Sequence, residues 1–156
     1  MHVYQGGQAV LEAYYRPYGG KYEKIAKFGF TTERGPSNEP IQDTIHEFYD
    51  IEKNRYNVGI GAIIYMFVEP QYRGKNIGTL ALEVISTIHS IQACDFTVLV
   101  ANDNGSGKLV DWYEKHGYKS APKLQDVMGS PNAKYGVTMI SPTQQTVPNN
   151  LCLKWW

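Results

Sequence analysis

The sequence predicts a single α/β domain in which helices flank a mixed central sheet. In the second half of the chain, apolar segments typical of buried strands alternate with amphipathic segments typical of helices. The chain has 156 residues, close to the usual size of one domain. Because 42% of the residues are hydrophobic and 19% are charged, we expect a folded chain with a buried core.

The first half of the chain reads as two strands, a loop and a helix. Residues 8–17 and 22–30 each hold a short strand, with a Gly-Gly turn signal between them. Residues 31–40 are rich in Thr, Gly, Pro, Ser and Asn, which is typical of a loop. Apolar residues then recur at helical spacing, so we predict a helix that begins at Pro40 and ends near Asn57.

The second half holds the strongest signals. Residues 58–68 are apolar on both alternate faces, as in a strand that is buried on both sides. Residues 77–92 predict an amphipathic helix. Its expected apolar stripe consists of Ile77, Leu80, Ala81, Val84, Ile85, Ile88 and Ile91.

Shorter elements complete the predicted sheet. Residues 96–101 read as a second buried strand, and residues 106–116 as a short helix that Gly117 ends in a left-handed conformation. Residues 135–140 alternate like a final strand. The aromatic residues of the tail 154–156 are expected to cover the sheet.

Composition restricts the function classes. The formal net charge is zero, so we expect no nucleic acid and no anionic membrane as partner. No apolar run reaches the roughly 20 residues that span a bilayer, and no secretory signal is visible. The lone pair Cys94 and Cys152 favours a reduced compartment. We expect a soluble, intracellular protein, in the cytoplasm or in a plastid if a transit segment has been removed.

The segment between the central strand and the long helix predicts a phosphate site. Two glycines, Gly74 and Gly78, allow a phosphate to approach the backbone, while Arg73 and Lys75 add positive charge. The start of a helix also offers N–H groups without partners, together with the positive end of its dipole. The competing interpretation is an ordinary strand–loop–helix connection with turn glycines.

Two other nucleotide motifs do not fit. Residues 105–108 contain Gly-Lys but lack the spacing of a Walker loop and the Ser or Thr that follows it. A G-x-G-x-x-G fingerprint directly after a strand is absent. The physical interpretation is therefore a site for a phosphate-bearing cofactor that uses neither motif.

The loop resembles a known family motif. V-x-P-x-x-R-G-x-x-I-G resembles the central acetyl-CoA motif of the GNAT superfamily of N-acetyltransferases, [QR]-x-x-G-x-[GA]. Arg73 takes its first position and Gly78 its last, whereas Asn76 replaces the middle glycine. Because Asn tolerates a positive φ better than other non-glycine residues, we expect the loop to keep its shape.

A second resemblance follows at the expected distance. Residues 109–118, LVDWYEKHGY, resemble the family's L-Y-E-K-x-G-F ending, with Trp112 where Leu is common. The polar loop before it resembles the one that holds a cofactor-contacting Asn, which maps to Ser106 by spacing and to Asn104 if displaced. The two matches span about residues 58–118, and the segment is also similar to plant and algal plastid members.

The resemblance implies a mixed sheet with splayed strands at the cofactor site, and acetyl-CoA as cosubstrate. It implies that the strand before the loop binds pantetheine through its backbone, that the loop holds the pyrophosphate, and that Tyr113 is the general acid. The implied cofactor-binding residues are Met66, Phe67, Val68, Arg73, Gly74, Lys75, Asn76, Ile77, Gly78, Thr79, Asn104 and Ser106. The side chains of residues 66–68 also fit a plain core strand.

Other candidate groups have simpler interpretations. His46 and Glu47 fall on an amphipathic helix, where charged residues usually form the solvated face, and Glu69 adjoins the loop. We expect His116 to cap a helix C-terminus. The histidines and cysteines lack ligand spacing, so we predict no metal site. The long polar segment 122–134 fits either an acceptor-site loop or a surface excursion.

Our hypothesis is an N-acetyltransferase, active as a monomer or homodimer, that moves an acetyl group directly from acetyl-CoA to a primary amine. The acceptor stays open between a protein α-amine, a lysine side chain and a small amine. One alternative is a non-catalytic acyl-CoA-binding sensor or scaffold, which would not need Tyr113. Another is a structural domain whose loop matches by coincidence.

Overall fold

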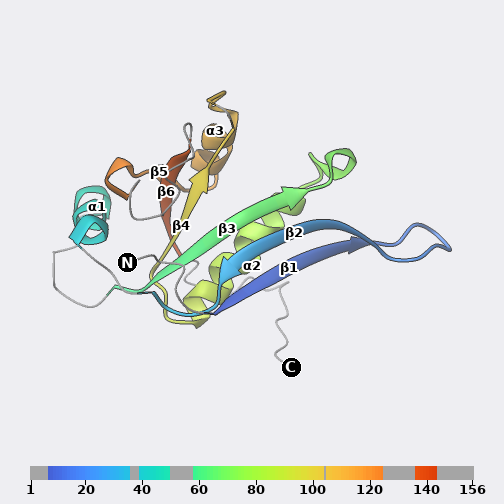
Figure 1. The fold of residues 1–156 in the computed structure, drawn as a ribbon, viewed down its shortest axis with the longest axis horizontal. Coiled ribbons are helices and arrows are strands. Elements are labelled where there is room, and N and C mark those ends of the chain that lie inside the picture. The colour runs from blue at the N-terminus through green and yellow to red at the C-terminus, as the bar shows by residue number, and fades with distance from the viewer. Residues whose placement is uncertain (1–6, 36–38, 50–57, 104, 125–135, 144–156) are drawn as a thin grey trace.

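The computed structural model describes residues 7–35, 39–49, 58–103, 105–124 and 136–143 (Figure 1). The strands are β1 Gln8–Tyr15, β2 Glu23–Thr31, β3 Ile60–Val68, β4 Phe96–Ala101, β5 Lys119–Ser120 and β6 Val137–Pro142. The helices are α1 Glu39–Tyr49, α2 Ile77–Ile91 and α3 Lys108–Lys115, with the 3₁₀ turns η1 Pro70–Tyr72 and η2 Pro122–Leu124. No helix in these ranges is long and apolar enough to cross a membrane.

The six strands form one mixed sheet in the order β1-β2-β3-β4-β6-β5. Neighbouring strands are antiparallel except β3 and β4, which are parallel and are joined by a crossover through α2. This arrangement confirms the predicted mixed α/β sheet. A parallel pair also leaves the ends of β3 and β4 at the same edge of the sheet, where the loop before α2 begins.

Helices cover the two faces of the sheet unequally. One core cluster joins α2 and α3 to β1, β2, β3, β4 and β6, and includes Phe28, Ile85 and Met139. A second cluster packs α1 and the η2 turn on the opposite face, over β3, β4 and β6. Figure 1 shows α2 running behind β1–β3, with α1 beside the other end of the sheet.

The strands β3 and β4 pair along only part of their length. Ile60–Ala62 pairs with Phe96–Val98, and no pairing continues beyond these residues. On its other side, β3 contains a bulge: Gly29 pairs with Tyr65 but Phe30 pairs with Ile63, which leaves Ile64 as the extra residue. The outer parts of β3 and β4 diverge (Figure 1), which confirms the expected splay.

The expected apolar stripe of α2 was wrong at two positions. Leu80 is 55% exposed and Ile91 is 48% exposed, whereas Leu82 and His89 are buried. The helix packs through residues 81, 82, 84, 85, 87, 88 and 89, so its buried face is rotated relative to the stripe. The final strand begins two residues later than predicted, at Val137. The predicted helix end near Asn57 and the tail 154–156 lie outside the described residues.

The buried imidazole of His89 connects α2 to the sheet. Its Nδ1 lies 2.8 Å from the hydroxyl of Thr97, and its Nε2 lies 2.9 Å from the carbonyl oxygen of Thr31. Because a carbonyl only accepts, Nε2 carries the proton of the neutral ring, and Nδ1 accepts from Thr97. Gly61 leaves room for the ring, since a Cβ there would lie 2.5 Å from its Cγ.

Burial lowers the pKa of His89 to about 4, although its hydrogen bond to Thr31 opposes the shift. In the unfolded chain, His89 therefore binds a proton as the pH falls through about 6.5. In the folded chain, it stays neutral until the pH approaches 4. Stability should be complete above about pH 6.5 and fall as the pH approaches 4. We expect His89 alone to lower the free energy of unfolding by about 2 kcal/mol between about pH 7 and pH 5.

Chemical denaturation of wild type, His89→Gln and the surface control His46→Gln at both pH values measures this effect. The control should keep the pH dependence, and His89→Gln should lose it. An NMR titration of wild type gives the same answer without a mutation: a His89 resonance that titrates near pH 6.5 would contradict the assignment.

Candidate functional site

A cleft of about 720 Å³ opens where β3 and β4 diverge. Its walls are the outer half of β3, the loop and first turn of α2, and one side of α3. Most of the residues expected from the sequence line it: Met66, Phe67, Val68, Arg73, Gly74, Asn76, Ile77, Gly78, Thr79 and Tyr113. Lys75 and Ser106 are not among the lining residues, and Asn104 lies outside the described residues.

The bulge in β3 decides which backbone groups face the cleft. The N–H of Ala62 donates to Thr31 Oγ1 and the N–H of Glu69 donates to Ile25 O, so both point towards β2. In a regular strand, the backbone N–H groups of two residues that are an odd number of positions apart, such as Ala62 and Glu69, would point to opposite sides of the strand. The extra residue Ile64 reverses the alternation, so the backbones of Met66 and Val68 face the gap.

Phe67 differs from its two neighbours. It pairs with Lys27, so its backbone faces β2 rather than the gap. Its side chain is 39% exposed and contributes to the cleft wall, together with that of Tyr65. The sequence-based expectation named all three backbones, but only those of Met66 and Val68 face the gap.

The loop before α2 forms a cradle of backbone N–H groups. Gly74 has φ of 79° and Asn76 has φ of 64°, which confirms the left-handed conformation expected for Asn76. No described group accepts a hydrogen bond from the N–H of residues 74–79, and the next N–H, of Leu80, donates to Asn76 O. The first turn of α2 contains no acidic residue. Free N–H groups at a helix start favour an anion such as phosphate.

Arg73 closes the end of β3. Its Nε donates to the carbonyl oxygen of Val68 at 2.9 Å, which occupies one of the strand groups that face the gap. The guanidinium is thereby held beside the N–H cradle, where it adds positive charge. The η1 turn before it is fixed by the N–H of Tyr72, which donates to Glu69 O at 2.9 Å.

Gly78 contacts α3. Its φ is not positive, but an added Cβ would lie 3.3 Å from Cη2 and 3.4 Å from Cζ2 of Trp112. The small residue therefore lets the indole approach the first turn of α2, in addition to any approach by a phosphate. In the sequence, Trp112 stands out only as a departure from the family motif.

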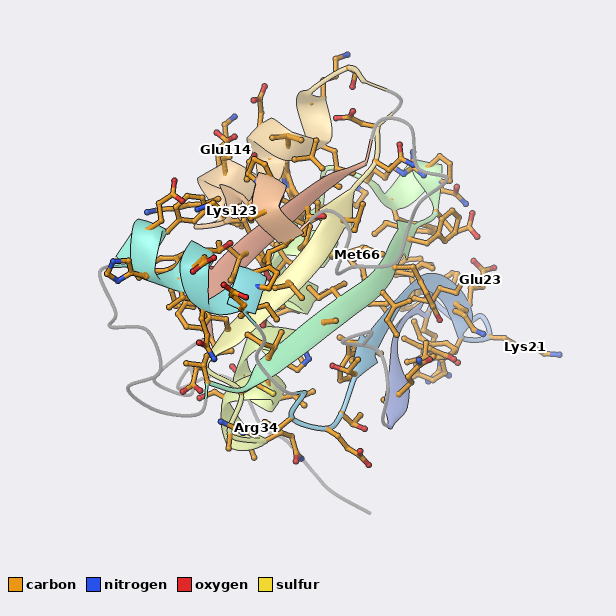
Figure 2. All side chains as sticks on the ribbon, turned by 60° about the vertical axis from the view of Figure 1, so that its left-hand side comes forward. Lys21, Glu23, Arg34, Met66, Glu114 and Lys123 are labelled. Carbon is orange, nitrogen blue, oxygen red and sulfur yellow. The ribbon has the colours of Figure 1, made fainter. Side chains whose placement is uncertain are left out.

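Tyr113 is 5% exposed, and its hydroxyl donates to the thioether sulfur of Met66 at 3.2 Å across the cleft. Figure 2 shows Met66 on β3, at the centre of the sheet. Burial raises the pKa of Tyr113 to about 12, so the hydroxyl stays protonated at neutral pH. The rings of Trp112 and Tyr118 pack against it at 5.0 and 5.6 Å between centroids.

His116 connects α3 to α2. It occupies the C-cap of α3, as expected, and its Nδ1 lies 2.8 Å from the carbonyl oxygen of Trp112. Its Nε2 lies 3.1 Å from the hydroxyl of Thr79, in the first turn of α2. Since the carbonyl requires a proton on Nδ1, the neutral ring accepts from Thr79 through Nε2. This bridge holds the helix of Tyr113 against the N–H cradle.

The polar loop before α3 is mainly structural. Asp103 accepts from the N–H of Leu109 at 2.8 Å and of Gly105 at 3.1 Å. The bond from Leu109 is the main cause of a lowered Asp103 pKa. Ser106 accepts from the N–H of Lys108, so its hydroxyl serves the turn. The residue of this loop that lines the cleft is Asn102, at the end of β4.

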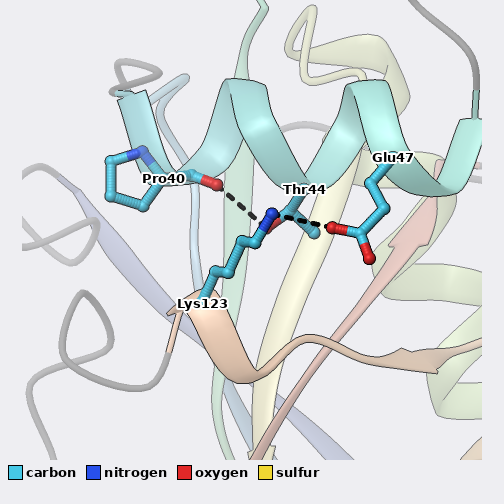
Figure 3. A network of polar contacts seen from close by, with 4 residues as sticks. All are labelled: Pro40, Thr44, Glu47 and Lys123. Atoms are coloured by element: carbon cyan, nitrogen blue, oxygen red, sulfur yellow. Dashed lines mark hydrogen bonds and ion pairs between the residues drawn. The ribbon is translucent and has the colours of Figure 1, made fainter.

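The general-base candidates lie elsewhere. Glu47 pairs with Lys123 at 2.8 Å and links α1 to the η2 turn on the opposite face of the sheet (Figure 3). His46 and Glu69 are also absent from the cleft lining. In segment 122–134 only the η2 turn is described, and its Leu124 is buried against α1. The described ranges hold no cluster of three His, Cys, Asp or Glu suited to a metal.

The sequence matches one family model, that of the acetyltransferase (GNAT) domain, over residues 38–120, more than half of the chain. No curated protein sequence matches the chain. Among solved structures, NAA60 from Arabidopsis thaliana in complex with a bisubstrate analogue is 15% identical, with a TM-score of 0.55 over 89% of this chain and 78% of that one.

Two further solved structures share this fold. A GNAT family acetyltransferase from Staphylococcus aureus is 14% identical, with a TM-score of 0.55 over 89% of this chain and 70% of that one. GCN5 from Tetrahymena is 10% identical, with a TM-score of 0.53 over 90% of this chain and 71% of that one. The matched family model, in a chain with splayed strands and an N–H cradle at their edge, shows that this protein belongs to the GNAT family of acyl-CoA-dependent acetyltransferases.

Proposed function

We propose that this protein transfers the acetyl group of acetyl-CoA directly to a primary amine, without a covalent enzyme intermediate. One observation carries the proposal: the protonated hydroxyl of Tyr113 is directed at a sulfur atom inside the cleft between the splayed strands. A thiol ester places its own sulfur in such a cleft when its pantetheine arm follows the free edge of β3.

The cleft has the groups that acyl-CoA requires. The backbone of Met66 and the N–H of Val68 face the gap and can pair with the amide groups of pantetheine, as a neighbouring strand would, whereas the carbonyl oxygen of Val68 already accepts from Arg73. The N–H groups of residues 74–79 and the charge of Arg73 suit the pyrophosphate. From the polar loop before α3, Asn102 rather than Ser106 lines this cleft. When bound, acetyl-CoA supplies the activated acetyl group.

Tyr113 supplies a hydrogen bond to the leaving group. As the amine nitrogen bonds to the acetyl carbon, the carbon–sulfur bond breaks and the thiolate needs a hydrogen-bond donor or a proton. A thiol has an ordinary pKa of about 8.5, below the value of about 12 for Tyr113. Burial also disfavours the thiolate and so raises the pKa of the thiol, which narrows the difference between the two pKa values. Because Tyr113 is the weaker acid, it keeps its proton and stabilises the leaving thiolate by donating a hydrogen bond to it.

The described lining of the cleft contains no carboxylate and no imidazole. We propose that the amine reacts as the free base and loses its proton to water. This favours weakly basic acceptors, because an α-amine has a pKa of about 7.7–8.0 and a lysine side chain about 10.4. A thiol-release assay tests both the activity and this order of acceptors. The panel contains peptides with a free N-terminus, peptides with an acetylated N-terminus and a free lysine side chain, and small amines. A non-catalytic binding module would release no thiol with any acceptor.

Tyr113→Phe should lower turnover by about 10² or more, the usual scale for a positioned acid, and leave CoA affinity nearly unchanged. The ring remains, so the packing against Trp112 and Tyr118 is kept. Tyr118→Phe is the matched control, because Tyr118 is also buried, with a raised pKa, but does not line the cleft. A Tyr113→Phe enzyme with near-native turnover under chemistry-limited conditions would reduce Tyr113 to a core residue.

Asn76→Gly should bind CoA at least as well as wild type. Asn76 adopts a left-handed conformation that glycine adopts without strain, and its side chain makes no helix-capping hydrogen bond. Isothermal titration with CoA measures the affinity. Loss of binding in a folded Asn76→Gly protein would show that the amide side chain contacts the ligand.

Gly78 substitutions should weaken CoA binding in order of size, slightly for Gly78→Ala and at least about tenfold for Gly78→Val. A Cβ at this position is 3.3 Å from the indole, so alanine needs a small shift and the branched side chain of valine a larger one. Titration of both variants, with thermal unfolding as the folding control, tests the order. Wild-type affinity in a folded Gly78→Val protein is incompatible with a cofactor at this turn.

A further inference from the structure

Trp112 lies between two parts of the site, the N–H cradle of residues 74–79 and the hydroxyl of Tyr113. It comes from α3, one residue before Tyr113, and its half-buried side chain lines the cleft. Its ring contacts Gly78 through Cη2 and Cζ2. Because Cζ2 is bonded to the carbon that carries Nε1, the nitrogen-bearing side of the indole is the side nearer to the first turn of α2.

The orientation of this ring is fixed from several sides. The imidazole of His116 packs against it with 4.5 Å between centroids, and Tyr113 packs edge-on at 5.0 Å. His116 itself is held by the carbonyl oxygen of Trp112 and the hydroxyl of Thr79. A side chain held in this way loses little further freedom when it binds a ligand.

The indole N–H is available. Within the described part of the chain no atom accepts a hydrogen bond from Nε1, and no buried side-chain nitrogen there lacks a partner, so this N–H reaches solvent in the cleft. A tryptophan N–H only donates, and half-buried indoles usually find an acceptor. The same cleft is lined by the N–H cradle of residues 74–79, whose groups also only donate. A ligand with several acceptor oxygens would accept hydrogen bonds both from the indole N–H and from the cradle.

We propose that Trp112 is a cofactor-binding residue whose Nε1–H donates to a pyrophosphate oxygen of acyl-CoA held by residues 74–79. This inference rests on the proposed function of the same cleft. It assigns a role to a position where the resembled motif commonly has leucine, which can fill space but cannot donate. It also gives Gly78 a second purpose, because any side chain there would push the indole away from the cradle.

The decisive comparison uses two substrates that differ in phosphate: acetyl-CoA, and S-acetylpantetheine, which has the thioester arm but no pyrophosphate. Trp112→Phe keeps an aromatic ring and removes the N–H. A hydrogen bond to a charged group accounts for about a tenfold to hundredfold change in binding. We expect Trp112→Phe to raise the Kd for CoA by at least about tenfold, and to lower kcat/KM for acetyl-CoA much more than for S-acetylpantetheine.

A second measurement needs no variant enzyme to be active. In wild type, the indole ¹H–¹⁵N resonance of Trp112, assigned by its loss in Trp112→Phe, should move downfield on addition of CoA and stay in place on addition of pantetheine. The shift reports the hydrogen bond itself, which a purely packing role of the ring would not produce.

Three outcomes would overturn the proposal. Native CoA affinity in Trp112→Phe, or an indole resonance that CoA leaves unmoved, removes the hydrogen bond. An equal loss of kcat/KM with both substrates shows that the ring only supports Tyr113. If wild type itself binds no acyl-CoA, the proposed function fails as well, and the wild-type titration identifies that case before any variant is made.

Discussion

The single extra residue in β3 is the constraint on which the site depends. Before the bulge at Ile64, β3 pairs with β4, and after it the two strands part. The bulge also reverses which backbone groups face β2, and so exposes those of Met66 and Val68 to the gap. Backbone groups without partners are normally rare inside a fold. Here one of them is satisfied by Arg73, from the loop that β3 itself leads into.

The rest of the cleft is built around that opening. The N–H cradle follows β3 directly, and the bridge from Thr79 through His116 to Trp112 sets α3 against it. The bridge fixes α3 at one end, and Asp103 caps it at the other. Tyr113 is thus presented to the gap by a helix of only eight residues, which would be marginal by itself. Donors fixed before the ligand arrives require no reorganisation during the reaction.

The sequence predicted those parts of the fold that depend on local pattern. Residues 96–101 were assigned without error, because an apolar run bounded by polar residues has few other interpretations. Asn76 was expected to adopt a positive φ, since only Asn substitutes readily for glycine there. The bulge could not be seen, because Ile63 and Ile64 are both apolar and no alternation marks the slip. The exposed Leu80 was misplaced for a related reason: hydrophobicity does not show how a helix is rotated against its sheet.

Contacts between distant segments were beyond pattern analysis. Asn102, rather than Ser106, lines the cleft because Asp103 and Ser106 serve the turn that starts α3. Counting residues back from Tyr113 cannot reveal that use. Trp112 was seen only as a departure from a motif. Its ring lies close to Gly78, a residue more than thirty positions earlier in the sequence, and the sequence gives each of the two residues a separate explanation.

The hydrogen-bond partner of Tyr113 in the cleft is chemically informative. Its hydroxyl donates to a thioether sulfur, which is among the weakest acceptors that proteins offer. In the proposed reaction, the acceptor opposite Tyr113 is first a thioester sulfur, which is also a weak acceptor, and then a thiolate, which is a strong one. The donor thus gains most at the point where negative charge develops, and little in the ground state. Under the proposed function, that difference is the condition for catalysis by a hydrogen bond, and it depends on two residues on opposite walls of the gap that the bulge opens.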